Sequence, residues 1–167
     1  MRTALIIPTR NAAPYLDRLL PALAQQTLQP DEFFVVDSQS SDDSVARLRA
    51  AGARVEVIAA TSFNHGGTRQ WASQQVDAEV LIFLTQDAIP CNPDSLANLK
   101  AGILSEDDIG VAYGRQLPHQ HAGLLARQAR QFNYPAHSRT KRLADAARPP
   151  KLGEKPASSR PPATGKA

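Results

Sequence analysis

The stretch Val80-Leu81-Ile82-Phe83-Leu84-Thr85-Gln86-Asp87-Ala88-Ile89-Pro90 indicates the fold of this chain. It begins with five consecutive apolar residues, which predict a strand buried on both faces at the centre of a sheet. The strand delivers the carboxylate of Asp87 to its C-terminal end, the edge at which open parallel sheets bind ligands. By position alone, Asp87 is equally well explained as a turn residue ahead of Pro90.

Two regions of different composition divide the 167 residues. Residues 139–167 contain eight Lys/Arg, two acidic residues, five of the thirteen prolines and no aromatic residue, which predicts a disordered basic tail. Residues 1–138 contain eleven Lys/Arg and fourteen Asp/Glu, a net charge of −3, and are expected to form one folded domain. The pI of about 9.3 is therefore a property of the tail, and we expect no nucleic-acid partner.

The remaining composition favours a cytoplasmic protein. A single cysteine, Cys91, excludes an internal disulfide and a zinc site built from several thiolates. No apolar run approaches the roughly 18 residues of a membrane span, and the apolar run after Met1 is too short for a signal peptide. We expect a cytoplasmic location, and the alternative is peripheral attachment to the inner face of the plasma membrane.

Short buried strands alternate with amphipathic helical segments along the chain, which predicts an α/β fold with a Rossmann-like, mostly parallel sheet flanked by helices. Pro8 is expected to end the first strand, Ser41 to cap the second helix, and Gly66-Gly67 to leave helix amides open to a ligand. The strands are expected at residues 3–7, 32–37, 54–58, 80–84 and 109–113. The helices are expected to begin near residues 14, 42, 68, 92 and 122.

Polar loops follow three of the predicted strands: Pro8-Thr9-Arg10-Asn11, Asp37-Ser38-Gln39-Ser40 and Thr85-Gln86-Asp87. Hydrogen-bonding groups and a carboxylate at one sheet edge suit a nucleotide. The glycine-rich motifs of dinucleotide and ATP sites are absent from the sequence. A bound diphosphate would then need a divalent cation held by a carboxylate, with Arg69 or Arg115 as further positive charge.

Structural explanations compete with these functional ones. Asp37 could cap the helix that follows it, and His65 could be an ordinary loop histidine. Trp71 is better explained as a core residue than as a stacking platform. Phe132 and Tyr134 are better explained by packing of their helix than by sugar contacts.

The motifs Ile6-Ile7-Pro8-Thr9-Arg10-Asn11, Val35-Val36-Asp37-Ser38-Gln39-Ser40-Ser41-Asp42 and Phe83-Leu84-Thr85-Gln86-Asp87-Ala88 resemble the successive motifs of family 2 glycosyltransferases with the GT-A fold. Residues 63–69, 84–90, 113–118 and 132–135 are similar to bacterial rhamnosyltransferases of surface-polysaccharide synthesis. The resemblance extends from residue 3 to about residue 153, so residues 1–138 would be the nucleotide-sugar-binding half of a longer GT-A domain.

The resemblance implies roles for residues after the first two strands. Pro8, Thr9 and Asn11 would line a nucleoside pocket. Asp37 would accept a hydrogen bond from the base N–H or from the ribose.

It also implies the residues that meet the phosphates. His65, Gly66 and Arg69 would lie along the base and the phosphates. Thr85-Gln86-Asp87 aligns with the Asp-x-Asp motif of the family, of which only the last carboxylate is present. Asp87 would therefore be the ligand of Mg²⁺ or Mn²⁺.

The implied reaction is inverting transfer of a sugar, rhamnose from dTDP-rhamnose, to a saccharide or lipid-linked saccharide acceptor in cell-surface polysaccharide synthesis. The metal would stabilise the leaving diphosphate while a base activates the acceptor hydroxyl. A UDP-sugar is the alternative donor. A non-catalytic nucleotide-sugar-binding fragment and a nucleotidyltransferase are the alternative functions, although the Gly-rich loop and lysine of the latter do not follow the first strand.

The similarity also predicts a chain that binds its donor without turning it over. Similar family members continue beyond this length, and their acceptor site and catalytic base lie in the later part. The acidic residues after Gly114 are Asp145 and Glu154, both in the predicted tail. The change of composition after Gly153 is typical of an out-of-frame reading of GC-rich DNA or of a natural disordered tail.

Overall fold

The computed structural model describes residues 1–118 and 123–134, with the backbone alone for residues 126 and 131–133. The chain divides after Gly114 into two units, and each is described by itself. In the second unit the described residues contain one helix, α5 Leu124–Asn133. The predicted disordered tail at 139–167 lies outside the described residues, so the domain boundary at residue 138 stays a prediction.

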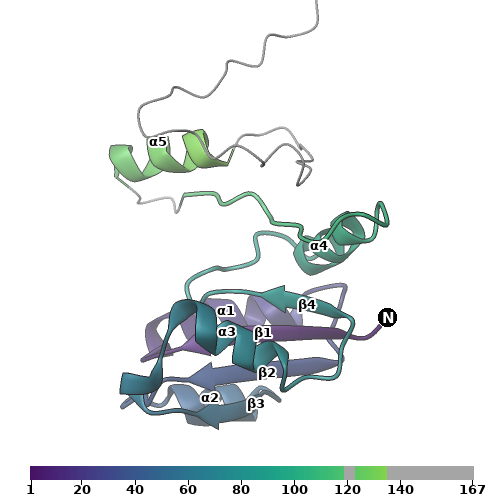
Figure 1. Ribbon diagram of the computed structural model, residues 1–167. Coiled ribbons are helices and arrows are strands. Elements are labelled where there is room, and N and C mark those ends of the chain that lie inside the picture. The colour runs from purple at the N-terminus through teal and green to yellow at the C-terminus, as the bar shows by residue number, and fades with distance from the viewer. Residues whose placement is uncertain (119–122, 135–167) are drawn as a thin grey trace, which may run out of the picture. The chain divides into compact units, whose positions relative to one another are not determined.

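Four parallel strands form the sheet of the first unit, in the order β3-β2-β1-β4 (Figure 1). They are β1 Thr3–Thr9, β2 Glu32–Asp37, β3 Arg54–Val57 and β4 Val80–Phe83. β1 pairs with β2 up to Thr9 opposite Asp37, and with β4 only up to Ile6 opposite Phe83. The parallel sheet confirms the predicted α/β class.

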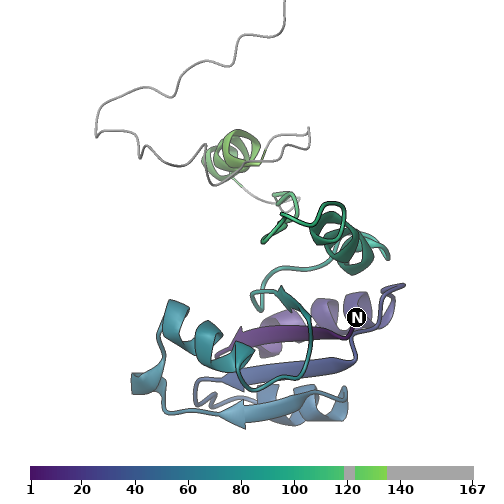
Figure 2. The ribbon, with the colours of Figure 1, turned by 45° about the vertical axis from the view of Figure 1, so that its right-hand side comes forward.

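Helices cover both faces of this sheet (Figures 1 and 2). They are α1 Ala13–Ala24, α2 Ser44–Ala50, the short 3-10 helix η1 Ala60–Ser62, α3 His65–Ser73 and α4 Ser95–Ile103. On one face α1, α2 and α4 bury Leu16, Leu48 and Leu96. On the other, α3 packs Ala72 against Phe34 of β2. Because both faces are covered, every residue of β1 is buried.

α1 forms as the sequence predicts. Pro14 stands in its first turn, where the missing N–H would have no helical partner. Pro21 lies inside the helix, yet the helix continues to Ala24.

The start of α2 differs from the prediction. Ser41 does not cap it, because the helix begins at Ser44 and Asp43 takes the N-cap position without a side-chain hydrogen bond. Ser41 instead donates its backbone N–H to the Asn11 side-chain oxygen at 2.9 Å. The serine therefore connects two loops rather than ending one helix.

Pro8 does not end β1. It remains in the strand, opposite Val36 of β2. Alternate residues of a strand direct their backbone groups to opposite neighbours, so the N–H that proline lacks would point toward β4. β4 has already separated from β1 there, so no ladder bond is lost.

The predicted central strand is an edge strand of the described sheet. β4 has β1 on one side and no strand on the other among the described residues. Phe83 is 38% exposed, so this strand is not buried on both faces. The predicted strand at 109–113 is wrong, because these residues are not paired and Val111 is 79% exposed. An apolar run predicts burial, but a strand also requires a hydrogen-bonded neighbour.

Candidate functional site

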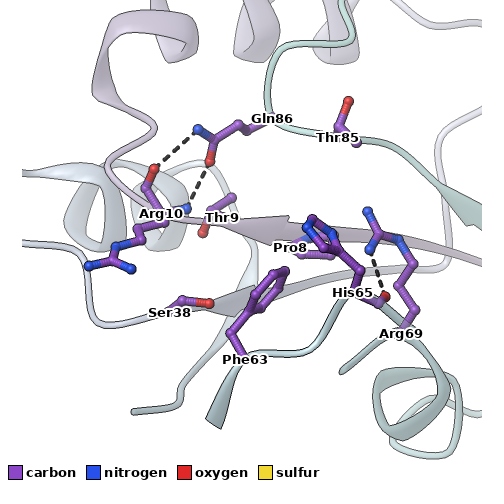
Figure 3. A pocket seen from close by; sticks show the side chains of 9 residues that line it. All are labelled: Pro8, Thr9, Arg10, Ser38, Phe63, His65, Arg69, Thr85 and Gln86. Carbon is purple, nitrogen blue, oxygen red and sulfur yellow. Dashed lines mark hydrogen bonds between the residues drawn. The ribbon is translucent and has the colours of Figure 1, made fainter. Parts of the chain in front are cut away.

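A pocket of about 210 Å³ lies where β1 and β2 end and the loop after β4 begins (Figure 3). Its position confirms that the polar loops after these strands meet at one sheet edge. The volume is below the roughly 300–1,000 Å³ of pockets for drug-sized ligands, so it accommodates part of such a ligand. The lining residues are Pro8, Thr9, Arg10, Ser38, Phe63, His65, Arg69, Thr85 and Gln86.

The predicted site residues divide into two groups. Those that line the pocket are Pro8, Thr9, His65, Arg69, Thr85 and Gln86. Those that do not line it are Asn11, Asp37, Gly66 and Asp87. The ligand contacts predicted for the residues of both groups stay predictions.

Three lining residues were not predicted: Arg10, Ser38 and Phe63. Arg10 and Ser38 belong to the polar loops that follow β1 and β2, so proximity to the strand ends is the signal that could have identified them. Phe63 is the first residue of the segment 63–69, whose similarity to rhamnosyltransferases is the signal that could have identified it.

Asp37 lies beneath the pocket and is fully buried. Its carboxylate accepts hydrogen bonds from the Thr9 hydroxyl at 2.9 Å and from the Ser40 N–H and hydroxyl at 2.8 and 2.6 Å. Both of its oxygens are therefore occupied by protein donors. Asp37 fixes the Thr9 side chain and the loop that follows β2.

Asn11 ties the loop after β1 to the loop after β2. Its backbone N–H donates to the Ser40 hydroxyl at 2.7 Å, while its side-chain oxygen accepts from Ser41 N–H. Asn11 has φ of 47° and Gln39 has φ of 56°, the left-handed region that asparagine tolerates better than most residues. Asn11 thus shapes the edge of the site through both its backbone N–H and its side-chain oxygen.

Asp42 joins the beginnings of α1 and α2. Its carboxylate accepts from the Ser44 N–H at 3.0 Å, from the Ala13 N–H at 3.2 Å and from the Ser44 hydroxyl. Desolvation disfavours the charged carboxylate, but these hydrogen bonds outweigh it and hold the pKa of Asp42 below its usual range. The carboxylate therefore stays charged at neutral pH and keeps the two helix starts together.

The start of α3 does not present free glycine amides. The Asn64 side-chain oxygen accepts from Gly66 N–H at 3.1 Å and from Gly67 N–H at 2.8 Å. The expectation of open amides was wrong because the asparagine before the glycines caps the helix itself. This cap orients the residues on either side of it, Phe63 and His65.

Replacing Asn64 by Ala should lower the free energy of unfolding by about 1 kcal/mol, because two helix amides lose their acceptor. Asn64→Asp retains an acceptor oxygen and serves as the matched control. Urea unfolding of both variants measures the effect. An equal decrease in the free energy of unfolding for Asn64→Ala and Asn64→Asp would contradict the capping role.

An aromatic pair and an arginine form the α3 side of the pocket (Figure 3). The rings of Phe63 and His65 lie edge to face, with centroids 5.0 Å apart. The Arg69 guanidinium donates to the His65 backbone carbonyl at 2.8 Å. The lining contains Arg10 and Arg69 and no carboxylate, so its charged groups favour an anionic ligand.

Asp87 is exposed in the turn after β4. Within the described residues its carboxylate has no hydrogen bond or ion pair, and no group of three His, Cys, Asp or Glu gathers there. Mg²⁺ is commonly held by one or two carboxylates together with substrate phosphates. A single free carboxylate at this edge fits such a cation only if a phosphate ligand supplies further oxygens.

The helices of residues 1–118 and 123–134 are all too short or too polar to cross a lipid bilayer.

The sequence is similar to two curated enzymes. It is 44% identical over 148 residues to the O-antigen chain rhamnosyltransferase RfbN of Salmonella typhimurium, covering 87% of this chain and 46% of that protein. It is 37% identical over 132 residues to the O-antigen chain rhamnosyltransferase WbaN of Salmonella anatum, covering 78% and 42%. The chain thus spans less than half the length of these relatives.

Solved structures share the fold. TarS 1–349 of S. aureus aligns with a TM-score of 0.52 and 30% identity, over 62% of this chain and 32% of that one. Glucosyl-3-phosphoglycerate synthase of Mycobacterium tuberculosis aligns with a TM-score of 0.55 and 21% identity, over 65% and 42%, a likeness of fold alone. The family model of glycosyl transferase family 2 matches residues 4–153, and the chain therefore belongs to that family.

Proposed function

We propose that this protein binds a nucleoside diphosphate sugar in the pocket and transfers the sugar to a saccharide acceptor with inversion. The observation that carries the proposal is one pocket, at the carboxyl ends of parallel strands, that gathers the family motif residues Pro8, Thr9 and Arg69. TarS, which shares 30% identity, has been solved with UDP-GlcNAc. Residues 1–138 would be the donor-binding part of the domain.

The proposed orientation of the donor follows from the pocket lining. The volume of about 210 Å³ suits a base and ribose rather than a whole nucleotide sugar. Phe63 and Pro8 offer apolar surface for the base, and the Thr9 hydroxyl, which donates to Asp37, keeps an acceptor position for the ligand. Arg69 and Arg10 are the positive charges for the diphosphate.

Asp87 would hold Mg²⁺ or Mn²⁺ in this proposal, since it is the free carboxylate beside the pocket loop. When bound, such a cation stabilises the negative charge of a leaving diphosphate. The described lining residues include no carboxylate that could deprotonate an acceptor hydroxyl, so no residue is assigned as the base.

The finer proposal is that the sugar is rhamnose and the donor dTDP-rhamnose, because the similar curated proteins are O-antigen chain rhamnosyltransferases. The acceptor would be a saccharide of a growing surface polysaccharide, carried on a lipid. The proposal includes a cytoplasmic location, and such an acceptor would bring the protein to the inner face of the plasma membrane as a peripheral partner.

The donor proposal predicts preferential binding of dTDP over UDP. One methyl group in an apolar pocket stabilises binding by about 0.8 kcal/mol, so the methyl alone should give a ratio of dissociation constants of about four, in addition to the effect of the 2′-hydroxyl that UDP carries and dTDP lacks. Competition calorimetry with both nucleotides measures it, and a clear preference for UDP would refute the thymidine assignment.

Direct tests of the function combine binding and turnover. Calorimetry with dTDP, with and without Mn²⁺, should show binding that the metal strengthens. An assay with dTDP-rhamnose and a lipid-linked saccharide should be run on this chain and on a longer version of the protein. Absence of nucleotide binding by both would overturn the proposal.

A further inference from the structure

β1 and β4 separate before β1 ends. The last hydrogen bond between them runs from Leu84 N–H to the Ile6 carbonyl at 3.1 Å. Pro8, the next β1 residue whose backbone faces β4, has no N–H to donate. β1 stays paired with β2 up to Thr9, and the Ser38 N–H donates to the Thr9 carbonyl at 2.8 Å. Only the β4 side opens, and residues from both sides of the opening line the pocket.

Arg10 is the next residue whose backbone groups face the departed strand. The side chain of Gln86 satisfies both of them (Figure 3). Its Oε1 accepts from the Arg10 N–H at 2.8 Å, and its Nε2 donates to the Arg10 carbonyl at 3.1 Å. Because a primary amide offers a donor and an acceptor side by side, it replaces the peptide group that a longer β4 would supply.

Gln86 belongs to a tight turn, closed by a hydrogen bond from Ala88 N–H to the Thr85 carbonyl at 3.0 Å. This turn supplies Thr85 to the pocket wall and carries Asp87 at its exposed corner. In the described residues, the Gln86 amide is the side-chain link between this turn and the end of β1.

We propose that Gln86 is a positioning residue, whose amide fixes the turn against Arg10 and so holds Thr85 and Asp87 beside the donor diphosphate. This role rests on the proposed donor-binding function. It requires an amide at position 86, since a carboxylate would turn a negative oxygen toward the Arg10 carbonyl. An aliphatic side chain would make neither bond.

The test uses Gln86→Met in the 167-residue chain, which preserves length and removes both bonds. Hydrogen exchange at the Arg10 amide should become about tenfold faster, and the Kd for dTDP with Mg²⁺ should rise about tenfold. The Kd for thymidine should rise less than about twofold, because the base and ribose contacts lie on the other walls. A merely structural role would weaken both ligands equally.

Gln29→Met is the matched control. The Gln29 amide also donates to backbone carbonyls, of Leu23, Ala24 and Gln26, but away from the pocket. We expect it to leave both dissociation constants unchanged.

Gln86→Glu provides a second variant in case the Met variant does not fold. It keeps the acceptor and loses the donor, so Arg10 exchange should be intermediate while dTDP still binds more weakly. An unchanged rate of hydrogen exchange at the Arg10 amide, or equal increases in the Kd for dTDP and for thymidine, would overturn the positioning role. If the wild-type chain binds no dTDP, the proposed function fails and the positioning role with it, while Arg10 exchange still reports the link itself.

Discussion

Replacing Asp87 by Ala should remove the increase in dTDP affinity that Mg²⁺ or Mn²⁺ provides. Asp87 is the free carboxylate at the end of β4, and the described residues offer no cluster of alternative ligands. Loss of residues that merely support a metal ligand costs about 10–100-fold, so loss of the ligand should raise the Kd in Mg²⁺ about 100-fold. Calorimetry of dTDP with and without the metal measures this change.

The fold should not change in this variant, because Asp87 is exposed and makes no bond within the described residues. Asp94→Ala is the control: Asp94 is also exposed, and its carboxylate accepts a hydrogen bond from the Thr27 hydroxyl. It should leave the metal effect intact. Unchanged dTDP affinity in Mg²⁺ after Asp87→Ala would show that Asp87 does not hold the cation.

Replacing Asp37 by Ala should lower the free energy of unfolding by about 2–4 kcal/mol. The buried carboxylate accepts bonds from Thr9 and Ser40, and hydrogen bonds to a charged group contribute about 1.5–3 kcal/mol each without adding fully. In the folded fraction, nucleoside affinity should fall by about 1–3 kcal/mol with or without metal, because the Thr9 side chain loses its partner. Urea unfolding and thymidine calorimetry measure the two effects.

Asp37→Asn is the conservative comparison. It retains one acceptor oxygen, and the Thr9 and Ser40 hydroxyls can rotate to accept from the new amide. We expect a loss of about 1 kcal/mol in stability. An Asp37→Ala variant that loses only metal-dependent binding would show that this carboxylate, and not Asp87 alone, acts on the cation.

The sequence predicted the ends of β2 and β4 closely but not that of β1, which continues through Pro8 to Thr9. Buried apolar runs that end in polar residues marked the ends of β2 and β4, and these loops do line one pocket. Interactions between distant segments were not visible. The buried carboxylate of Asp37 accepts a hydrogen bond from the Thr9 hydroxyl, which comes from another strand. The Asn64 side chain accepts from the Gly66 and Gly67 amides and so competes with any ligand for them.

The strand predictions that were wrong concern segments whose apolar pattern does not show which strand lies beside them. The segment 80–84 was predicted to be central, but sheet order places β4 at the edge of the described sheet. The segment 109–113 has the composition of a strand and no strand partner among the described residues. A strand forms only when a second strand hydrogen-bonds to it, and the apolar pattern of one segment does not show which segment that neighbour is.

By itself, the sequence determined the α/β class, the alternation of strands and helices that gives a parallel sheet, and the family. These depend on periodicity and on motifs that are recognised within short segments. Only the tertiary structure decided that Phe63 joins the pocket, that Asp37 faces inward, and that Gln86 bridges to Arg10. Each of these contacts joins residues far apart in the chain. Their geometry follows from how β1, β2 and β4 pair, and above all from the point at which Pro8 allows two strands to part.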